Sequence, residues 1–395
     1  MGWCAPSRWS PVQPPGQGDA VTTDGPALAE ALPALLAALG TGLGAPSTIA
    51  LPRVRSAVLF LVDGLGRELL TEHAADAPFL AGMHDAGPLT VGFPTSTPIS
   101  VTSLGTGLPP GGHGTLGVRF RVDATLLDAL TWTQGTDDLR ERLAPEVVQP
   151  HPTLFERAAA AGVASTVVSA RAYRESGLTR SALRGATYRG VGALGDLAAE
   201  TLTALARPGL VYAYHADLDQ LGHLHGPGSL AWRWQLRQID HLVAMLAEDL
   251  PPGTLLAVTG DHGMVAVDRR HDADTHPDLL LAEPVVGGDP RARLVYARPG
   301  SAPDVLAAWR ATLGGDATVL TGEQAIDDGW FGPVDDAVRD RVPDVVAVTR
   351  GSAAVVRSEG EPVLARLPGQ HGAVTDAERF VPLLVHAADA ASPAG

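Results

Sequence analysis

The chain has 395 residues, a formal net charge of −15 and a single cysteine. The length suits one large α/β domain or a core with an inserted subdomain, and the lone cysteine excludes an internal disulfide framework. The acidic balance argues against a nucleic-acid polymer as partner. Because the sequence contains no lysine, a mechanism that needs one, such as a phosphate-binding P-loop, is also excluded.

The N-terminal residues 1–25 are rich in proline, glycine and polar residues, which predicts a flexible leader rather than a signal peptide. No run of about 18 or more apolar residues occurs elsewhere, so we expect no membrane span and no membrane partner. A cytoplasmic location is the resulting expectation. Residues 27–39 are rich in alanine and leucine and precede Gly40, which favours a helix with a glycine cap.

Short apolar runs alternate with helical patterns along most of the chain. Residues 57–62 have the sequence AVLFLV, which is typical of a strand buried on both faces of a parallel sheet. Thr153 and Glu156 form a capping box that opens a helix, and Gly162 ends it. Further strands are expected at residues 163–169, 210–214, 255–259 and 381–385, and a further helix at residues 236–246. This alternation predicts an α/β fold, a mostly parallel sheet with helices on both faces.

The pattern changes between residues 287 and 335. A strand is expected here at residues 293–297, a helix at residues 303–313 and a second short strand at residues 317–320. We interpret this segment as a small inserted α+β subdomain. It divides the core into a first part and a C-terminal part, residues 26–286 and 336–395.

Four motifs place acidic or imidazole side chains beside glycine, near the ends of predicted buried strands. They contain Asp63, Asp219 with His223, Asp261 with His262, and His371. The carboxyl ends of the strands face the ligand crevice in open α/β sheets, so groups from distant parts of the chain can meet there. Three carboxylates and three imidazoles suit two Zn²⁺ or similar divalent ions. Three carboxylates and two divalent cations together have a net charge of about +1, which would suit a phosphoryl anion.

Each motif alone also fits an ordinary structural role. An aspartate after a buried strand often caps a turn or a helix, and Asp219 with His223 fits an i,i+4 pair on one helix face. Asp-His-Gly and His-Gly also occur in loops. The occurrence of all four motifs in this order, each at a strand end, favours the metal site.

A hydroxyl-rich segment between Phe93 and Ser100 supplies candidate nucleophiles. It fits a Ser/Thr turn that opens a helix over residues 98–105, since these residues are favoured N-caps. A hydroxyl at a helix N-terminus also lies where backbone N–H groups favour a phosphate. A threonine needs an activating metal ion to act as a nucleophile.

Together these motifs resemble those of the type I phosphodiesterase and nucleotide pyrophosphatase branch of the alkaline phosphatase superfamily. The resemblance runs in chain order from Asp63 to about Leu384. It includes PTSTPIS around Thr97, then TGLPPGGHG, DQLGH at 219–223, DHGM at 261–264 and His371 followed by glycine. It implies an alkaline phosphatase-like fold and hydrolysis of phosphodiester or pyrophosphate bonds in a small phosphorylated substrate, for which a nucleotide is the first candidate.

The resemblance also implies roles for individual residues. It implies one metal ion held by Asp219, His223 and His371, and a second held by Asp63, Asp261 and His262. Zn²⁺ is the first expectation for both ions and Mn²⁺ the alternative. Thr97 would bridge to the second ion and form a covalent phospho-threonine intermediate. The spacing back from Thr106 favours Thr97 over Thr95 and Ser96.

One position departs from the family pattern. The nucleotide pyrophosphatases carry Phe-Pro-Asn-His after the nucleophile, with the asparagine donating to a phosphoryl oxygen, whereas this chain has Pro98-Ile-Ser-Val101. Ser100 takes the asparagine position and is the candidate substrate-binding donor, with a shorter reach. Nucleotide-diester specificity therefore does not follow from the resemblance.

Other polar residues remain open to two interpretations. His113 is expected to pack against or bond a loop rather than bind metal. The segment from Ser176 to Thr179, with Arg171 and Arg174 nearby, either approaches the substrate or is an exposed turn with solvated arginines.

Several functions compete with the leading hypothesis. A phosphomonoesterase, a phosphonate hydrolase or a phosphotransferase of the same superfamily would share the metal set. A sulfatase is disfavoured, because no Cys/Ser-x-Pro-x-Arg pattern surrounds Thr97. A non-catalytic metal- or nucleotide-binding protein would show a gap in the ligand set or lack the hydroxyl, and the sequence has neither. The pattern does not indicate an oligomeric state.

Overall fold

The computed structural model describes residues 25–43 and 47–388. The predicted leader lies outside the described residues except for Gly25. The expected first helix is confirmed as a short 3-10 turn, η1 (Leu28–Glu30), followed by α1 (Ala31–Ala38). Gly40 follows it with a φ of +86°, a backbone conformation that favours glycine. None of the helices in the described part of the chain combines the length and apolarity that a membrane span requires.

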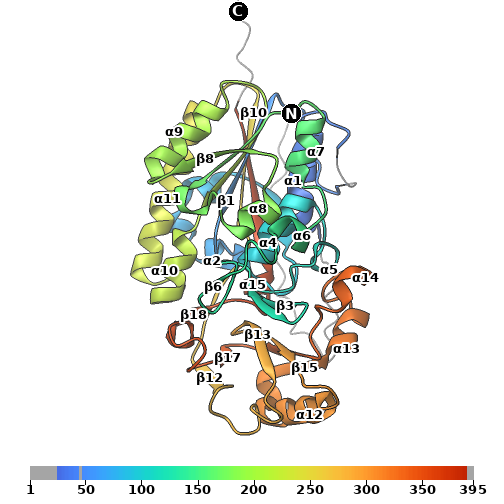
Figure 1. Ribbon diagram of the computed structural model, residues 1–395. Helices are drawn as coiled ribbons and strands as arrows, with labels where there is room; N and C mark the ends of the chain where they lie inside the picture. Colours follow the sequence, from blue (N-terminus) through green and yellow to red (C-terminus); the bar gives the residue numbers. More distant parts are fainter. Residues whose placement is uncertain (1–24, 44–46, 389–395) are drawn as a thin grey trace, which may run out of the picture.

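A seven-stranded sheet forms the centre of the molecule (Figure 1). Its strands are β1 (Ser56–Val62), β2 (His84–Thr90), β7 (Ser165–Ala170), β8 (Thr187–Val191), β9 (Leu210–His215), β10 (Thr254–Thr259) and β19 (Phe380–Ala387). Their order in the sheet is β2-β19-β10-β1-β9-β7-β8. The neighbouring strands from β10 to β8 pair in parallel, and β19 runs antiparallel to both β10 and β2. The predicted mostly parallel α/β sheet is confirmed.

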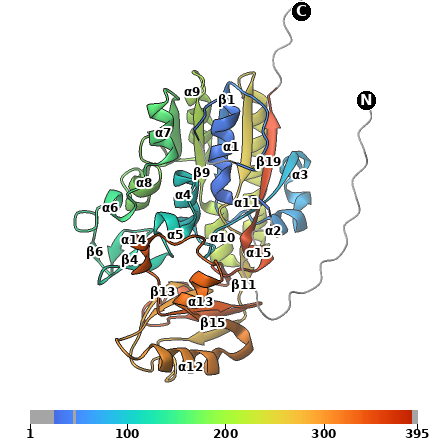
Figure 2. The ribbon, with the colours of Figure 1, turned by 90° about the vertical axis from the view of Figure 1, so that its right-hand side faces the viewer.

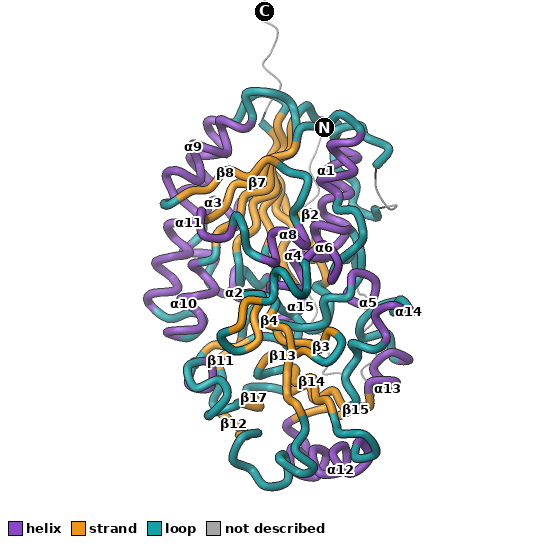
Figure 3. The backbone as a smooth tube through the Cα atoms, viewed as in Figure 1, coloured by secondary structure: helices purple, strands orange, loops and turns teal. Residues whose placement is uncertain are grey.

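Helices cover both faces of this sheet, and the strands lie between them in Figure 3. One face carries α2 (Arg67–Glu72), α3 (Pro78–Gly82), α9 (Leu194–Ala204), α10 (Asp217–His225) and α11 (Leu230–Asp249). The other carries α1, α4 (Thr97–Thr106), α7 (Leu154–Ala160) and α8 (Gly177–Ala182). Alternate residues of β1 join opposite hydrophobic clusters: Val58 and Phe60 pack under α11, whereas Leu59 and Leu61 pack under α1 and α4. This two-sided burial explains why the strand is wholly apolar.

Local capping signals begin two of the helices: the Thr153 cap is the one that the sequence predicts, whereas α11 begins at Leu230, ahead of the helix expected at residues 236–246. The Thr153 hydroxyl accepts a hydrogen bond from the Glu156 N–H, and the Glu156 carboxylate accepts one from the Thr153 N–H. Ser229 caps α11 in a similar way by accepting from the Trp232 N–H. The remaining short helices are η2 (Ala74–Asp76), α5 (Pro110–His113), α6 (Pro145–Val148), η3 (Arg171–Tyr173) and α15 (Asp376–Arg379).

A second lobe lies below the central sheet in Figures 1 and 2. It is built on an antiparallel sheet of order β13-β14-β16-β15. Its elements are β13 (Val285–Asp289), β14 (Ala292–Tyr296), α12 (Ala302–Leu313), η4 (Gly314–Asp316), β15 (Ala317–Thr321), α13 (Gly322–Asp327), α14 (Asp336–Arg339) and β16 (Val345–Thr349). Helix α12 covers one face of this sheet through Val305, Trp309 and Leu313.

The four-stranded sheet extends past residue 335, where the sequence places the end of the inserted subdomain. Strand β16 follows that boundary yet lies between β14 and β15. All five of its residues are buried. A short, wholly apolar run looks the same in either sheet, so its sequence does not tell which sheet it joins.

Three smaller sheets connect the two lobes. One is a meander of β3 (Arg119–Val122), β4 (Thr125–Asp128), β5 (Thr133–Gln134) and β6 (Asp137–Asp138). The other two pair β12 (Arg269–Asp272) with β17 (Ala353–Val356), and β11 (Val265–Ala266) with β18 (Gly369–Gln370). The last pair aligns Val265 with Gln370, which brings the DHGM segment beside His371.

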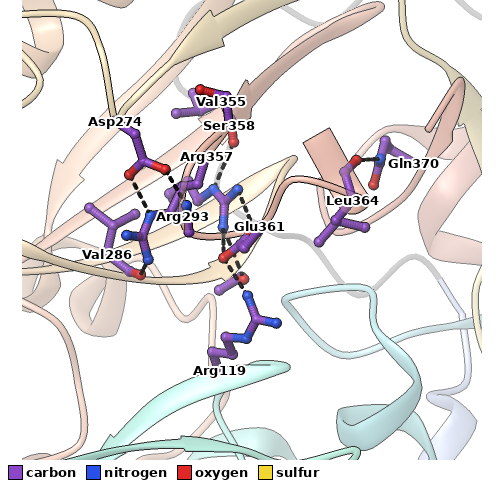
Figure 4. A network of polar contacts seen from close by, with 12 residues as sticks. Arg119, Asp274, Val286, Arg293, Val355, Arg357, Ser358, Glu361, Leu364 and Gln370 are labelled. Atoms are coloured by element: carbon purple, nitrogen blue, oxygen red, sulfur yellow. Dashed lines mark hydrogen bonds and ion pairs between the residues drawn. The ribbon is translucent and has the colours of Figure 1, made fainter. Parts of the chain in front are cut away.

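Buried ion pairs attach the chain around residue 371 to the second lobe. Arg291 and Glu378 form a two-point pair with distances of 2.7 and 2.9 Å, and both side chains are 0% exposed. Glu378 also accepts from the Ala373 N–H. Figure 4 shows a neighbouring network in which the Glu361 carboxylate forms ion pairs with Arg293 and Arg119. In the same view the Gln370 side chain donates a hydrogen bond to the carbonyl of Leu364, the first residue of η5 (Leu364–Arg366).

We expect Glu378→Gln to destabilise the protein by about 3 kcal/mol, because it leaves the buried Arg291 guanidinium without its counter-charge. The matched control is Glu283→Gln, which removes the same charge from the exposed pair with Arg298 and should change stability by at most about 0.5 kcal/mol. Urea unfolding followed by circular dichroism measures both. Equal unfolding midpoints for the two variants would contradict this assignment.

Candidate active site

The predicted site residues meet at the carboxyl edge of the central sheet. Asp63 directly follows β1, and Asp261 and His262 follow β10. Asp219 and His223 lie on α10, which follows β9. Because β1 pairs with both β10 and β9, these three segments are neighbours at one edge of the sheet.

One predicted ligand group assembles around His262. Ligand atoms of Asp63, Asp261 and His262 all lie within 4.8 Å of one another. His262 Nε2 is 3.5 Å from Asp63 Oδ1 and 3.5 Å from Asp261 Oδ2. This spacing allows one ion to contact all three side chains.

The second group has a different composition from the one that the family resemblance implies. Asp219 and His371 lie within 4.8 Å of each other, and the third member within that limit is His262. His223 lies beside this group, with Nε2 3.4 Å from Asp219 Oδ2 and its ring 5.0 Å from that of His371. The structure thus brings all six predicted ligands together, with the His262 and His371 rings stacked at 3.7 Å.

Backbone carbonyls orient all three imidazoles. Nδ1 of His223 lies 2.8 Å from the Gly369 carbonyl oxygen, Nδ1 of His262 lies 3.0 Å from that of Gly263, and Nδ1 of His371 lies 2.8 Å from that of Thr95. A carbonyl only accepts, so each Nδ1 carries the proton and each Nε2 keeps a free lone pair. This is the arrangement that metal-binding histidines require.

The carboxylates are partly held by donors and partly left open. Asp261 Oδ1 accepts from the Gly64 and His262 N–H groups at 2.9 and 3.0 Å. The Tyr214 hydroxyl donates to Asp63 Oδ2. Asp261 Oδ2 and Asp219 Oδ1 are buried without a hydrogen-bond partner among the described residues. Buried oxygens of this kind need a compensating partner, and a divalent cation supplies one.

The electrostatics of the side chains agree with this need. Burial, reinforced by the nearby charges of Asp261 and Asp219, raises the pKa of Asp63 well above its usual range. Burial also raises the pKa of Asp219 to about 6 and lowers the pKa of His262 to about 3. The protein alone therefore disfavours the charged carboxylates, and cations between them would offset that cost.

Three neighbouring hydroxyls differ in what they contact. Thr95 Oγ1 donates to the Ala373 carbonyl at 2.9 Å, and Ser96 Oγ donates to Asp289 Oδ1 at 3.2 Å; both are buried. Thr97 Oγ1 is only partly buried, 3.2 Å from His262 Nε2 and 3.4 Å from Asp63 Oδ1. Of the three, Thr97 is the hydroxyl that faces the ligand groups. It is also the first residue of α4, with Ser96 as N-cap.

Ser100 and His113 are engaged within the protein. The Ser100 hydroxyl, 1% exposed, donates to the Asp261 carbonyl at 2.6 Å, and its role as a substrate-binding donor stays a prediction. The Thr115 N–H donates to His113 Nδ1 at 3.1 Å, so the proton of His113 lies on Nε2, 3.0 Å from Ser103 Oγ. His113 thus bonds a loop, in agreement with its expected role, and burial lowers its pKa to about 3.

A cavity of about 560 Å³ opens beside Thr97 and Asp63. Ser176 and Thr179 line this cavity, as expected if the segment approaches the substrate. Arg171 and Arg174 do not line it, as expected for arginines of an exposed turn. The sequence analysis missed other lining residues, namely Ser169, Tyr173, Tyr188, Tyr214 and Asp217. Four of them lie at or just beyond the carboxyl ends of β7 and β9, and this position was the signal available in the sequence; Tyr188 lies near the amino end of β8.

Comparison with known proteins places this geometry in a family. The family described as type I phosphodiesterase / nucleotide pyrophosphatase matches residues 57–374. Murine ectonucleotide pyrophosphatase / phosphodiesterase 5, solved as an inactive variant in complex with AMP, has a TM-score of 0.64 and 17% identity, covering 84% of this chain and 88% of that chain. Phosphonoacetate hydrolase from Sinorhizobium meliloti 1021, solved with phosphonoacetate, has a TM-score of 0.64 and 20% identity, covering 87% of this chain and 92% of that chain.

Similarity to curated proteins is confined to a short stretch. Human ectonucleotide pyrophosphatase/phosphodiesterase family member 7 is 39% identical over 66 residues, which are 15% of this chain and 14% of that protein. The matched stretches span between 7% and 14% of the length of the curated relatives. The family match, in contrast, covers most of the chain and includes every predicted ligand. The chain therefore belongs to the type I phosphodiesterase / nucleotide pyrophosphatase family of the alkaline phosphatase superfamily.

Proposed function

We propose that this protein is a two-metal hydrolase of phosphodiester or pyrophosphate bonds that uses Thr97 as its nucleophile. The observation that carries the proposal is the position of Thr97 Oγ1, within 3.4 Å of both His262 Nε2 and Asp63 Oδ1. Two buried carboxylate oxygens without hydrogen-bond partners lie in the same site. A hydroxyl beside anionic side chains that can hold a metal ion is the arrangement that metal-activated nucleophilic attack requires.

Two divalent ions would favour the alkoxide of Thr97 and offset the charge that develops on the phosphoryl oxygens. Zn²⁺ is the first candidate for both ions, and Mn²⁺ is the alternative. Asp63, Asp261 and His262 would hold one, and Asp219, His371 and His223 the other. The Nδ1–carbonyl bonds keep each imidazole in its ligand orientation. Tyr214 holds Asp63 in place through its hydroxyl.

The proposed reaction has two steps. Thr97 Oγ1 forms a bond to phosphorus while the bond from phosphorus to the leaving oxygen breaks, which gives a phospho-threonine. Water then attacks the same phosphorus, and the bond to Thr97 Oγ1 breaks, which restores the threonine and releases the second product. The N-terminus of α4, where Thr97 lies, favours the phosphoryl anion in both steps.

The cavity beside Thr97 favours a diester or pyrophosphate over a monoester. With a volume of about 560 Å³ it is within the range of small-ligand pockets. A phosphomonoester with a small substituent would leave most of it empty, whereas a diester would place one substituent in the cavity and one outside. The substrate is therefore proposed to be a small phosphorylated molecule. A cytoplasmic location stays a prediction.

We expect Thr97→Ala to lower kcat/KM for bis-p-nitrophenyl phosphate by about 10³-fold or more, because it removes the attacking oxygen. The matched control Ser96→Ala removes a neighbouring hydroxyl that bonds Asp289 instead and should change kcat/KM by less than about tenfold. Wild-type protein should also turn over p-nitrophenyl phosphate more slowly than the diester. Undiminished turnover by Thr97→Ala would place the nucleophile elsewhere.

We expect chelation of bound metal to abolish turnover and to lower Tm, because ligands that bind only the folded state stabilise it. Zn²⁺ or Mn²⁺ added back should restore both, and elemental analysis should find about two ions per chain. Asp261→Asn should reduce the bound metal while leaving the circular dichroism spectrum unchanged. Full activity in metal-free protein would refute the two-metal mechanism.

A further inference from the structure

The walls of the cavity beside Thr97 are aromatic and aliphatic. The Tyr173 and Tyr214 rings meet edge to face with centroids 6.2 Å apart, and Tyr188 also lines the cavity. The Tyr188 hydroxyl donates to the Ala170 carbonyl at 2.7 Å, and the Tyr214 hydroxyl donates to Asp63, so the polar ends of both residues are occupied. Val101, Leu178 and Leu183 add aliphatic surface. Such walls suit an apolar or aromatic group.

The carboxylates that line the cavity have no arginine beside them among the described lining residues, and Arg174 lies 5.4 Å from the centroid of the lining Tyr188 ring without lining the cavity itself. No arginine occurs among the described residues that line it, and the chain contains no lysine. Its lining carboxylates are Asp63, Asp219 and Asp217. Asp63 and Asp219, together with His223, belong to the proposed ligand groups, where cations would offset them. Among the described lining residues, Asp217 is the one carboxylate that belongs to neither proposed ligand group.

Asp217 lines the cavity and makes no ion pair with an arginine within the described structure. It is the first residue of α10, where the helix dipole favours an anion, and its side chain is 56% exposed. His215 Nε2 lies 3.7 Å from Asp217 Oδ2, but the Gln235 amide nitrogen lies 2.9 Å from the same Nε2. That amide nitrogen can only donate, so His215 Nε2 accepts and has no proton to share with Asp217.

We propose that this cavity binds one ester substituent of the substrate and selects substituents that carry no negative charge, with Asp217 as the specificity-determining residue. The inference rests on the proposed phosphodiester hydrolysis. A second anionic group, such as a carboxylate or a further phosphate, would lose hydration against tyrosine and leucine side chains and meet no arginine among the described residues that line the cavity. It would also be repelled by Asp217, and at separations near 4 Å such repulsion corresponds to about a tenfold effect or more.

The test compares two diesters that differ by one carboxylate, p-nitrophenyl phenyl phosphate and p-nitrophenyl 4-carboxyphenyl phosphate. Release of p-nitrophenolate by the metal-loaded enzyme gives kcat/KM for each. We expect the wild type to prefer the uncharged phenyl ester by about tenfold or more, and Asp217→Asn to narrow this ratio to about threefold or less. Asp249→Asn, which removes one exposed carboxylate at the end of α11, should keep the wild-type ratio.

Equal wild-type rates for the two diesters, or an unchanged ratio in Asp217→Asn, would overturn the inference while leaving the proposed hydrolysis intact. Failure of the proposed hydrolysis has a different signature, namely no turnover of either diester. In that case we would measure, by calorimetry, the dissociation constants of the same two diesters for Zn²⁺-loaded Thr97→Ala protein. These constants decide whether the cavity selects against a negatively charged substituent. The same tenfold preference supports charge selection by the cavity, and equal dissociation constants reject it.

Discussion

Three aspartates that repel one another, two buried and one largely buried, are the constraint on which the rest of the structure depends. Asp63, Asp219 and Asp261 lie in one site, and burial raises the pKa of each. Such a cluster persists only where the surrounding structure holds it rigidly and something offsets the charge. The rigidity comes from the parallel pairing of β1 with β9 and β10, which fixes the segments that carry the aspartates. The two oxygens without hydrogen-bond partners are where offsetting cations would bind.

The chain around residue 371, which is attached to the second lobe, supplies the last predicted ligand of the site. The pairing of β11 with β18 places His371 against the segment that carries His262, and their rings stack. The buried Arg291–Glu378 pair fixes the loop that follows His371, because Glu378 accepts a hydrogen bond from the Ala373 N–H. The Thr95 carbonyl then links His371 to the segment of the proposed nucleophile. The position of His371 in the site therefore depends on the packing of the second lobe.

Much of the fold and of the site could be predicted from the sequence, because both depend on strong local signals. Apolar runs such as residues 57–62 mark buried strands, and the Thr153 capping box marks a helix start. Asp63, Asp219 and Asp261 were found because each lies beyond the carboxyl end of a strand of the central sheet, whereas His371 follows the short strand β18 of a separate antiparallel pair. Two features that the sequence did not reveal depend on long-range contacts: the membership of β16 in the second sheet and the bond from Ser100 to the Asp261 carbonyl. The meander of β3 to β6 is local but its strands are short. Among the tyrosines that line the cavity, Tyr188 lies near the amino end of β8, where no strand-end signal marks it.

The β11–β18 ladder has only two residues on each strand, yet it joins positions more than a hundred residues apart. Contacts with such separation form late, since the entropy of closing a long loop must be overcome first. His371 also leaves the ribosome long after Asp63. A nascent chain therefore carries most of the proposed ligands before it can close the site around them. We therefore expect closure of the site by His371 to be a late step in folding.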